Sequence, residues 1–181
     1  MRTAAYLRWM LAPALAGLAL VAAFNFAVDP LQFYRRASFY PAQYSANQRY
    51  QNAALVRTHD FDTVVLGTSH MENARPSIVE AALGGTVLKL AVAGSALREQ
   101  TQLARMALAR GTVRRVIWGI DYSSFTVLGR VLDDYGPFPR HLYRGALGAA
   151  GPYLLSRDTL GDSLAALRAS APGDLDALNT W

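Results

Sequence analysis

The chain has 181 residues, a formal net charge of +5 and no cysteine. The absence of cysteine excludes disulfides, thiol nucleophiles and cysteine-ligated metal sites. The arginines are scattered, with Arg35-Arg36 and Arg114-Arg115 as the only doublets. We therefore interpret the positive charge as solvated surface and predict no nucleic-acid partner.

An uncharged apolar segment lies near the N-terminus, from Trp9 to Val28. At 1.5 Å per residue, roughly 20 helical residues match the ~30 Å hydrocarbon core of a bilayer. We therefore predict that residues 1–28 form a short cytoplasmic tip and a transmembrane signal anchor. A cleaved signal peptide is the alternative, because Val21-Ala22-Ala23 offers small residues at a suitable cleavage position. The length of the segment and its lack of a polar face disfavour a buried core helix.

The charges around this segment predict its orientation. Arg2 and Arg8 precede it, and the first charge after it is Asp29. Because positive residues favour the cytoplasmic side, we expect the N-terminus inside the cell and the remainder exported. The sequence thus predicts a single-pass protein of the inner (cytoplasmic) membrane. The lipid bilayer is one partner, and the C-terminal domain lies in the periplasm or outside the cell.

Regular patterns begin at Asp62, after a stretch rich in aromatic and amide residues that we interpret as an irregular connector, residues 29–61. From there, short apolar runs alternate with helical patterns that end at glycine, and Ser95 is expected to cap the second helix. Such alternation predicts an α/β domain, residues 62–181, with a parallel sheet covered by helices on both faces. The expected elements are strands at Thr63–Leu66, Val87–Val92 and Val113–Ile120, and helices at Pro76–Leu83, Ala96–Arg110 and Ser156–Ser170.

Each predicted strand ends in a polar step that contains glycine. These steps are Gly67-Thr68-Ser69-His70, Gly94-Ser95 and Gly119-Ile120-Asp121. In an open parallel sheet, ligands bind outside the carboxyl ends of the strands. The first turn would expose Ser69, and N–H groups near Ser69 and Gly94 could stabilise an oxyanion, so the sequence predicts acyl-transfer chemistry. The alternative is a tight strand-to-helix turn without a catalytic role.

These residues, over about Asp62 to Phe125, resemble the SGNH (GDSL-like) hydrolase superfamily. The similarity is to its membrane-anchored envelope branch, which includes polysaccharide O-acetylation and lipoteichoic acid D-alanylation proteins. The resemblance implies a three-layer, flavodoxin-like parallel-sheet domain without a cofactor. It also implies that Ser69 is the nucleophile and that the N–H groups of Ser69 and Gly94 form the oxyanion hole.

The chain departs from the family pattern at two blocks. Gly119-Ile120-Asp121-Tyr122 stands where the family usually carries Gly-x-Asn-Asp, without the asparagine that the family uses as an oxyanion donor. The late Asp-x-x-His pair is also missing, since no histidine follows His141. We therefore expect a domain that is incomplete at its C-terminus.

The resemblance implies an esterase or acyltransferase that acts on O-acyl groups of a cell-envelope polysaccharide or another acylated polymer. A membrane-bound acyl donor protein is a further partner implied by the family. Because the Asp-x-x-His block is missing, this chain could instead be inactive. The alternative function is a non-catalytic, membrane-anchored module that binds glycan or docks assembly partners.

Three histidines could supply a general base, which must lie within about 3 Å of the nucleophile. His59 precedes the first strand and should lie at the opposite end of the sheet from Ser69. His70 is adjacent to Ser69, and His141 falls in a segment without a clear pattern. We expect the substrate to contact Thr68, His70, Ser95 and Asp121, although Asp121 could also orient the loops or cap a turn. We predict no metal site: His59, Asp60 and Asp62 are clustered in the sequence but lack a fourth ligand.

Overall fold

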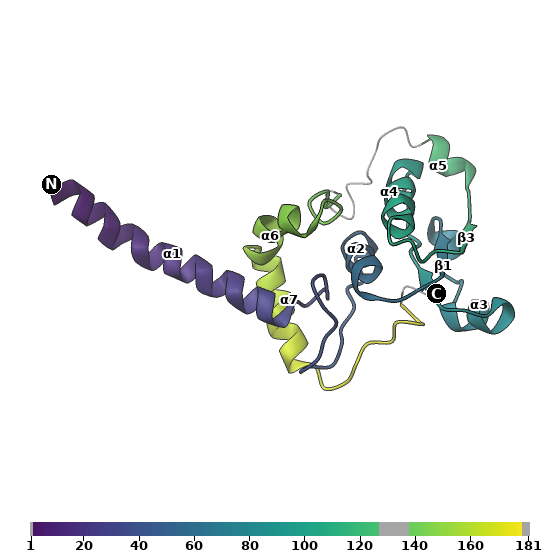
Figure 1. Ribbon diagram of the computed structural model, residues 1–181, viewed down its shortest axis with the longest axis horizontal. Coiled ribbons are helices and arrows are strands. Elements are labelled where there is room, and N and C mark those ends of the chain that lie inside the picture. The colour runs from purple at the N-terminus through teal and green to yellow at the C-terminus, as the bar shows by residue number, and fades with distance from the viewer. Residues whose placement is uncertain (1, 127–137, 179–181) are drawn as a thin grey trace.

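The computed structural model describes residues 2–126 and 138–178, and it folds as an α/β domain behind a long N-terminal helix (Figure 1). The elements in chain order are α1 (Arg2–Val28), α2 (Gln48–Thr58), β1 (Thr63–Leu66), the 3-10 helix η1 (Ser69–Met71), α3 (Pro76–Leu83), β2 (Val87–Lys89), α4 (Leu97–Leu108), β3 (Arg115–Trp118), α5 (Tyr122–Thr126), α6 (Ala146–Leu154) and α7 (Arg157–Arg168).

The three strands form one parallel sheet in the order β2-β1-β3. β1 is central, with Thr63 opposite Val87 on one side and Arg115 on the other. All four residues of β1 are buried, as its continuous β-branched and apolar run predicts for a strand covered on both faces. The predicted parallel α/β sheet is therefore confirmed.

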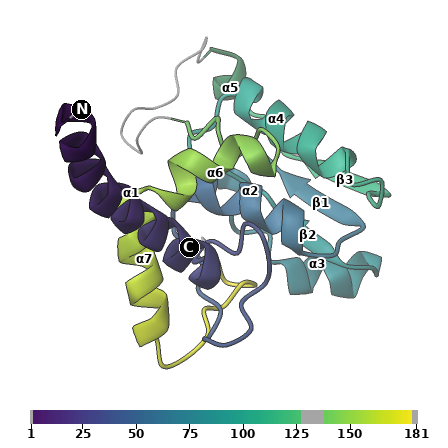
Figure 2. The same ribbon diagram turned by 60° about the vertical axis from the view of Figure 1, so that its left-hand side comes forward.

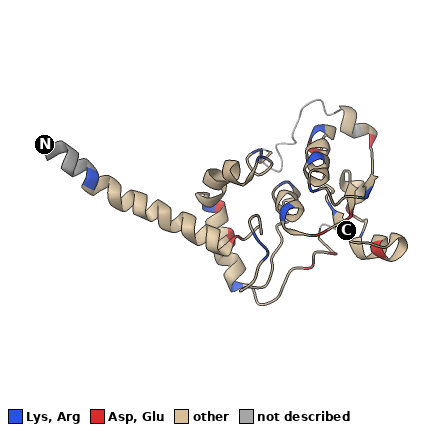
Figure 3. Ribbon diagram, viewed as in Figure 1, with Lys and Arg blue, Asp and Glu red and all other residues tan. Residues whose placement is uncertain are grey.

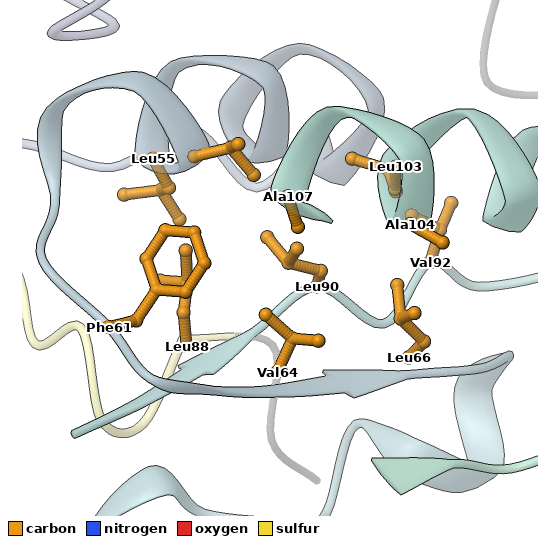
Figure 4. Packing of buried hydrophobic residues seen from close by; sticks show 11 residues of the cluster. Leu55, Phe61, Val64, Leu66, Leu88, Leu90, Val92, Leu103, Ala104 and Ala107 are labelled. Carbon is orange, nitrogen blue, oxygen red and sulfur yellow. The ribbon is translucent and has the colours of Figure 1, made fainter. Parts of the chain in front are cut away.

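The main core lies between the sheet and the pair α2 and α4 (Figure 4). Alternation along β1 points Val64 and Leu66 to this face, where they meet Leu55 of α2 and Leu103 of α4. Figure 2 shows α3 on the opposite side of the sheet from α2 and α4. α3 covers its face thinly, because none of its side chains is buried and Ile78 is 64% exposed.

Several element boundaries match the sequence analysis. β1 and α3 have the predicted ends, with Pro76 opening α3 and Gly84 closing it at φ +67°. The second and third strands are shorter than predicted, because pairing with the four-residue β1 limits their ladders. The prediction that Ser95 caps α4 was wrong: Ala96 holds the N-cap position, and no side chain caps it.

The structure forms helix α2 within residues 29–61 and helix α6 further on, and neither was predicted. Helix α2 was not predicted because its buried face is polar: Gln48, Arg49 and Asn52 are buried among apolar neighbours. Their hydrogen bonds go to residues far along the chain, such as Ala91 and Ala93. A helix whose buried face is polar does not show the apolar period on which the prediction relied.

The N-terminal helix contains a stretch, Arg8–Val28, that is long and apolar enough to cross a membrane, with a mean hydropathy of 2.0. Length and composition of this kind fit both a membrane anchor and a signal sequence. Figure 3 shows no charged residue in α1 after Arg8. The helix projects away from the domain, and the residues from Arg8 to Leu20 are all exposed.

The last turns of α1 are built into the folded domain. Asn25 is fully buried, donating to the carbonyl of Leu154 at 2.8 Å and accepting from the Ser163 hydroxyl at 3.0 Å. Directly after the helix, the carboxylate of Asp29 accepts the N–H groups of Phe33, Tyr34 and Arg35 at 2.7 to 3.0 Å. These bonds fix the chain where it leaves α1, so the helix is joined to the domain without a free linker.

Candidate functional site

The ends of the three strands converge around β1. Gly67 accepts the N–H of Val92 at 3.0 Å, and Gly119 donates to the carbonyl of Leu66 at 2.9 Å. The loop after β1 therefore lies between the segments that follow β2 and β3. Because the crossovers through α3 and α4 run on opposite faces of the sheet, the connections diverge between β1 and β3. This is the topological switch point where open parallel sheets bind ligands.

Gly67 is required at this point by space as well as by conformation. Its φ is +148°, and a Cβ added to it would lie 2.9 Å from the carbonyl oxygen of Gly119 and 2.4 Å from Cγ of Met71. A larger residue would push the ends of β1 and β3 apart. The glycine thus allows the loop that carries Thr68, Ser69 and His70 to approach β3 closely.

Asp121 joins the first and third strand ends. It accepts a hydrogen bond from the Thr68 hydroxyl, and its Oδ1 lies 2.9 Å from Nδ1 of His70. Because an ionised carboxylate can only accept, Nδ1 of His70 carries the proton of this bond, and Nε2 is the acceptor nitrogen of the neutral ring. The bonds from Thr68, and then from His70, hold the pKa of Asp121 below its usual range.

The His70 side chain is 79% exposed, whereas that of Asp121 is 22% exposed. The carboxylate thus binds the Nδ1 edge of the imidazole and leaves the rest of the ring open to solvent. This is the arrangement in which an aspartate fixes the tautomer of a histidine that exchanges protons with a substrate. The geometry makes His70 a stronger candidate for the general base than its adjacency to Ser69 suggested.

Ser69 is the first residue of η1 and is half-buried. Its N–H and that of Gly94 donate to no acceptor in the described part of the chain, and Gly94 adopts φ +58°. Unpaired N–H groups at a strand end can stabilise a developing negative charge. The Ser69 hydroxyl likewise has no hydrogen-bond partner among the described residues.

Ser95 lies inside the protein rather than beside the exposed His70. It is 2% exposed, and its hydroxyl accepts a hydrogen bond from the Gln100 side chain at 3.0 Å. Gln100 in turn accepts the indole N–H of Trp118 at 2.7 Å. Ser95 therefore helps to hold the loop after β2 in place. We had expected it to contact the substrate, because it follows a strand end.

A buried polar network connects the loop after β1 with the loop after β2. The Gln48 side chain accepts the N–H of Ala93 at 2.6 Å and donates to the carboxylate of Glu72. It therefore links the residue before Gly94 to the helical turn that Ser69 begins. Beside it, Arg49 and Glu99 form an ion pair at 3.1 Å, with side chains 3% and 5% exposed. Gln48 and Arg49 were not expected at the site, because no helix was predicted at α2.

The other two histidines lie away from Ser69. His59 caps the C-terminus of α2, before β1 and so at the opposite end of the sheet, as predicted. Burial, with help from nearby Arg36, lowers the pKa of His59 to about 4. His141 lines a separate hollow with Tyr50 and Asp158. Within the described ranges, no three side chains of metal-ligating type lie together.

A cavity of about 490 Å³ lies beside β2, between α2, α3 and the segment that contains Leu175 and Asp176. Its lining includes Glu72 and Lys89, whose ammonium group donates to the Glu72 carbonyl at 2.7 Å. Neither Ser69 nor His70 is among its lining residues. The cavity is therefore a neighbour of the strand-end cluster and does not contain it.

The fold and the site together define an α/β protein with a Thr68–Asp121–His70 cluster at the switch point of a parallel sheet, behind an N-terminal apolar helix. No protein-family model, curated protein or solved structure matches the chain. Its function must be inferred from the geometry of this cluster and from the residues around it.

Proposed function

We propose that the protein is held in the cytoplasmic membrane by α1 and acts on O-acyl esters of a cell-envelope polymer, as an SGNH-like esterase or acyltransferase. Ser69 is the nucleophile, and the N–H groups of Ser69 and Gly94 stabilise the oxyanion. The Asp121–His70 pair supports this proposal most strongly, because it supplies an oriented histidine beside a serine at the end of the central strand. The late Asp-x-x-His block is then not needed for a base.

In this mechanism the Ser69 hydroxyl attacks the ester carbonyl while Nε2 of His70 accepts its proton, directly or through one water. Asp121 keeps the ring in the required tautomer and stabilises the imidazolium that forms. The leaving alcohol then takes the proton from His70. Water or a hydroxyl of the polymer then attacks the acyl carbon while Nε2 of His70 takes its proton. The bond to Oγ of Ser69 breaks and Oγ takes the proton from His70, so that the acyl group leaves as a free acid by hydrolysis or as a new ester by transfer.

Labelling with a fluorophosphonate tests the nucleophile. The full-length protein in detergent should be labelled, and the Ser69→Ala variant should not. Ser170→Ala is the matched control, because Ser170 is exposed and lies after α7. Labelling of Ser69→Ala equal to that of the parent would rule out Ser69 as the nucleophile.

One observation favours the alternative, a non-catalytic module that binds envelope glycan. The Ser69 hydroxyl makes no hydrogen bond to His70 in this structure, although catalytic bonds often tighten only when substrate is bound. A binding module would retain affinity for acylated polysaccharide in the Ser69→Ala variant and would release no acyl group in the parent. An enzyme would release acyl groups in the parent and lose that activity with Ser69→Ala.

A further inference from the structure

The helix α6 stands out because its exposed surface is apolar and it lies beside the end of α1. No charged residue occurs between Arg144 and Arg157, a stretch that includes the whole of α6 (Figure 3). Leu147 is 95% exposed, the highest value among the large hydrophobic residues that the structure describes, and Leu155 just beyond the helix is 48% exposed. Such exposure in an uncharged segment needs a partner that is itself apolar.

The buried and exposed faces of α6 are distinct. Ala149 and Tyr153 are buried against Phe33 and the alanines of α2, so they hold the helix to the domain. At 3.6 residues per turn, the exposed Leu147 and Gly151 lie on the side opposite this contact, whereas Leu154 is half-buried and packs against it. The outer face of α6 is therefore uncharged along its length.

The position of α6 along α1 links this face to the membrane. Burial along α1 begins at Val21, since the residues from Arg8 to Leu20 are all exposed. Within the docked part, Asn25 donates to the carbonyl of Leu154, the last residue of α6. Both ribbon views show α6 beside this end of α1 (Figures 1 and 2).

The length of the apolar stretch leaves no exposed spacer between the bilayer and the folded domain. Arg8–Val28 has 21 residues, and such a helix is about 31 Å long, close to the ~30 Å of the hydrocarbon core. If it spans, the segment Val21–Val28, about 12 Å long, must reach the headgroup boundary. The elements packed against that segment must reach the same depth.

We propose that α6 is an interfacial helix, whose outer face of Leu147 and Gly151, with Leu155 just beyond it, lies in the headgroup region of the leaflet that the C-terminal end of α1 enters. This inference rests on the proposed membrane anchor. The exposed Arg144 and Arg157 flank the face and suit lipid phosphates. The exposed Asp158, next to Arg157 in the chain, borders a hollow that Asp162 also lines. The domain is thus held against the bilayer surface in one orientation.

The absence of cysteine makes a direct test possible, because a single introduced cysteine can be labelled alone. The full-length protein would carry the environment-sensitive fluorophore NBD at Leu147→Cys in α6, at Leu15→Cys in α1, or at Ile78→Cys in α3. Ile78 is the matched control, as a 64% exposed aliphatic residue on a helix that does not pack against α1. Each variant would be reconstituted in phosphatidylethanolamine and phosphatidylglycerol vesicles, with and without brominated acyl chains.

The label at position 147 should show a blue-shifted emission and lose intensity with brominated lipid, whereas the label at position 78 should do neither. Equal behaviour at positions 147 and 78 would overturn the inference, and quenching at position 15 would then show that the anchor itself still stands. If positions 147 and 15 both escape quenching, the anchor fails as well. A blue shift at position 147 without quenching would mean that a second copy of the protein covers α6, which also contradicts the proposal.

Discussion

Nδ1 of His70 lies 2.9 Å from Oδ1 of Asp121, although 51 positions of sequence separate the two residues. The pairing of β1 with β3 brings them together, because Gly67 and Gly119 follow the two strands in register. The contact makes Asp121 an orienting group for an exposed histidine.

Asp121→Asn should impair the proposed ester hydrolysis while the fold persists. The amide can donate to Nδ1, which would place the ring proton on Nε2 and remove the base. We expect kcat to fall by about 10² or more, the usual contribution of general base catalysis, with little change in KM. Asp60→Asn is the control, since the side chain of Asp60 is 91% exposed. A kcat equal to that of the parent would show that Asp121 does not orient a base.

Arg49→Met should strongly destabilise the domain. It leaves Glu99 buried without its ion-pair partner, and breaking such a pair costs about 3–5 kcal/mol. Arg98→Met, on the exposed side of α4, should change the free energy of unfolding by less than about 0.5 kcal/mol. Urea unfolding of the full chain in detergent measures both. The double variant Arg49→Met with Glu99→Leu should recover much of the loss, and failure to recover would mean that packing, not charge, dominates.

Two glycine-to-alanine substitutions should have opposite signs. Gly67→Ala places a methyl group 2.9 Å from a backbone oxygen, at a positive φ, and should destabilise by roughly 1–3 kcal/mol. Gly161→Ala lies inside α7 with no atom within 4 Å of the new Cβ, so it should stabilise by up to about 1 kcal/mol. Thermal unfolding of both variants provides the comparison. A neutral Gly67→Ala would show that the loop after β1 can relax away from β3.

His59 should make stability depend on pH. Burial lowers its pKa to about 4, so the folded state resists protonation, whereas the unfolded chain binds the proton near the ordinary value of about 6.5. The contribution of neutral His59 is therefore present above about pH 6.5 and is lost as the pH falls toward 4. The free energy of unfolding of the parent should fall relative to that of His59→Gln in this pH window. Below the window, the two curves of unfolding free energy against pH should be parallel. Parallel curves throughout would mean that His59 is not buried in the neutral form.

Local sequence patterns were sufficient to predict the elements that depend on residues close together in the chain. The apolar run of β1, the proline and glycine that bound α3, and the uncharged length of α1 each follow from short-range chemistry. The convergence of the steps at Gly67, Gly94 and Gly119 also followed, because parallel strands share the direction of their carboxyl ends.

Tertiary structure alone decided the roles of individual polar groups. The sequence placed both Ser95 and His70 at strand ends. In the structure, Ser95 is buried and hydrogen-bonded to Gln100, whereas His70 is exposed and hydrogen-bonded to Asp121. Likewise α2 is stable because Gln48 and Arg49 meet partners 24 to 50 positions away. A polar side chain is tolerated in a core only when its hydrogen bonds are satisfied, and those partners are set by the fold and not by the neighbouring residues. The sequence by itself therefore determined the strands, the apolar helix and the edge of the sheet that carries the site. The packing decided which side chains at that edge can reach a substrate.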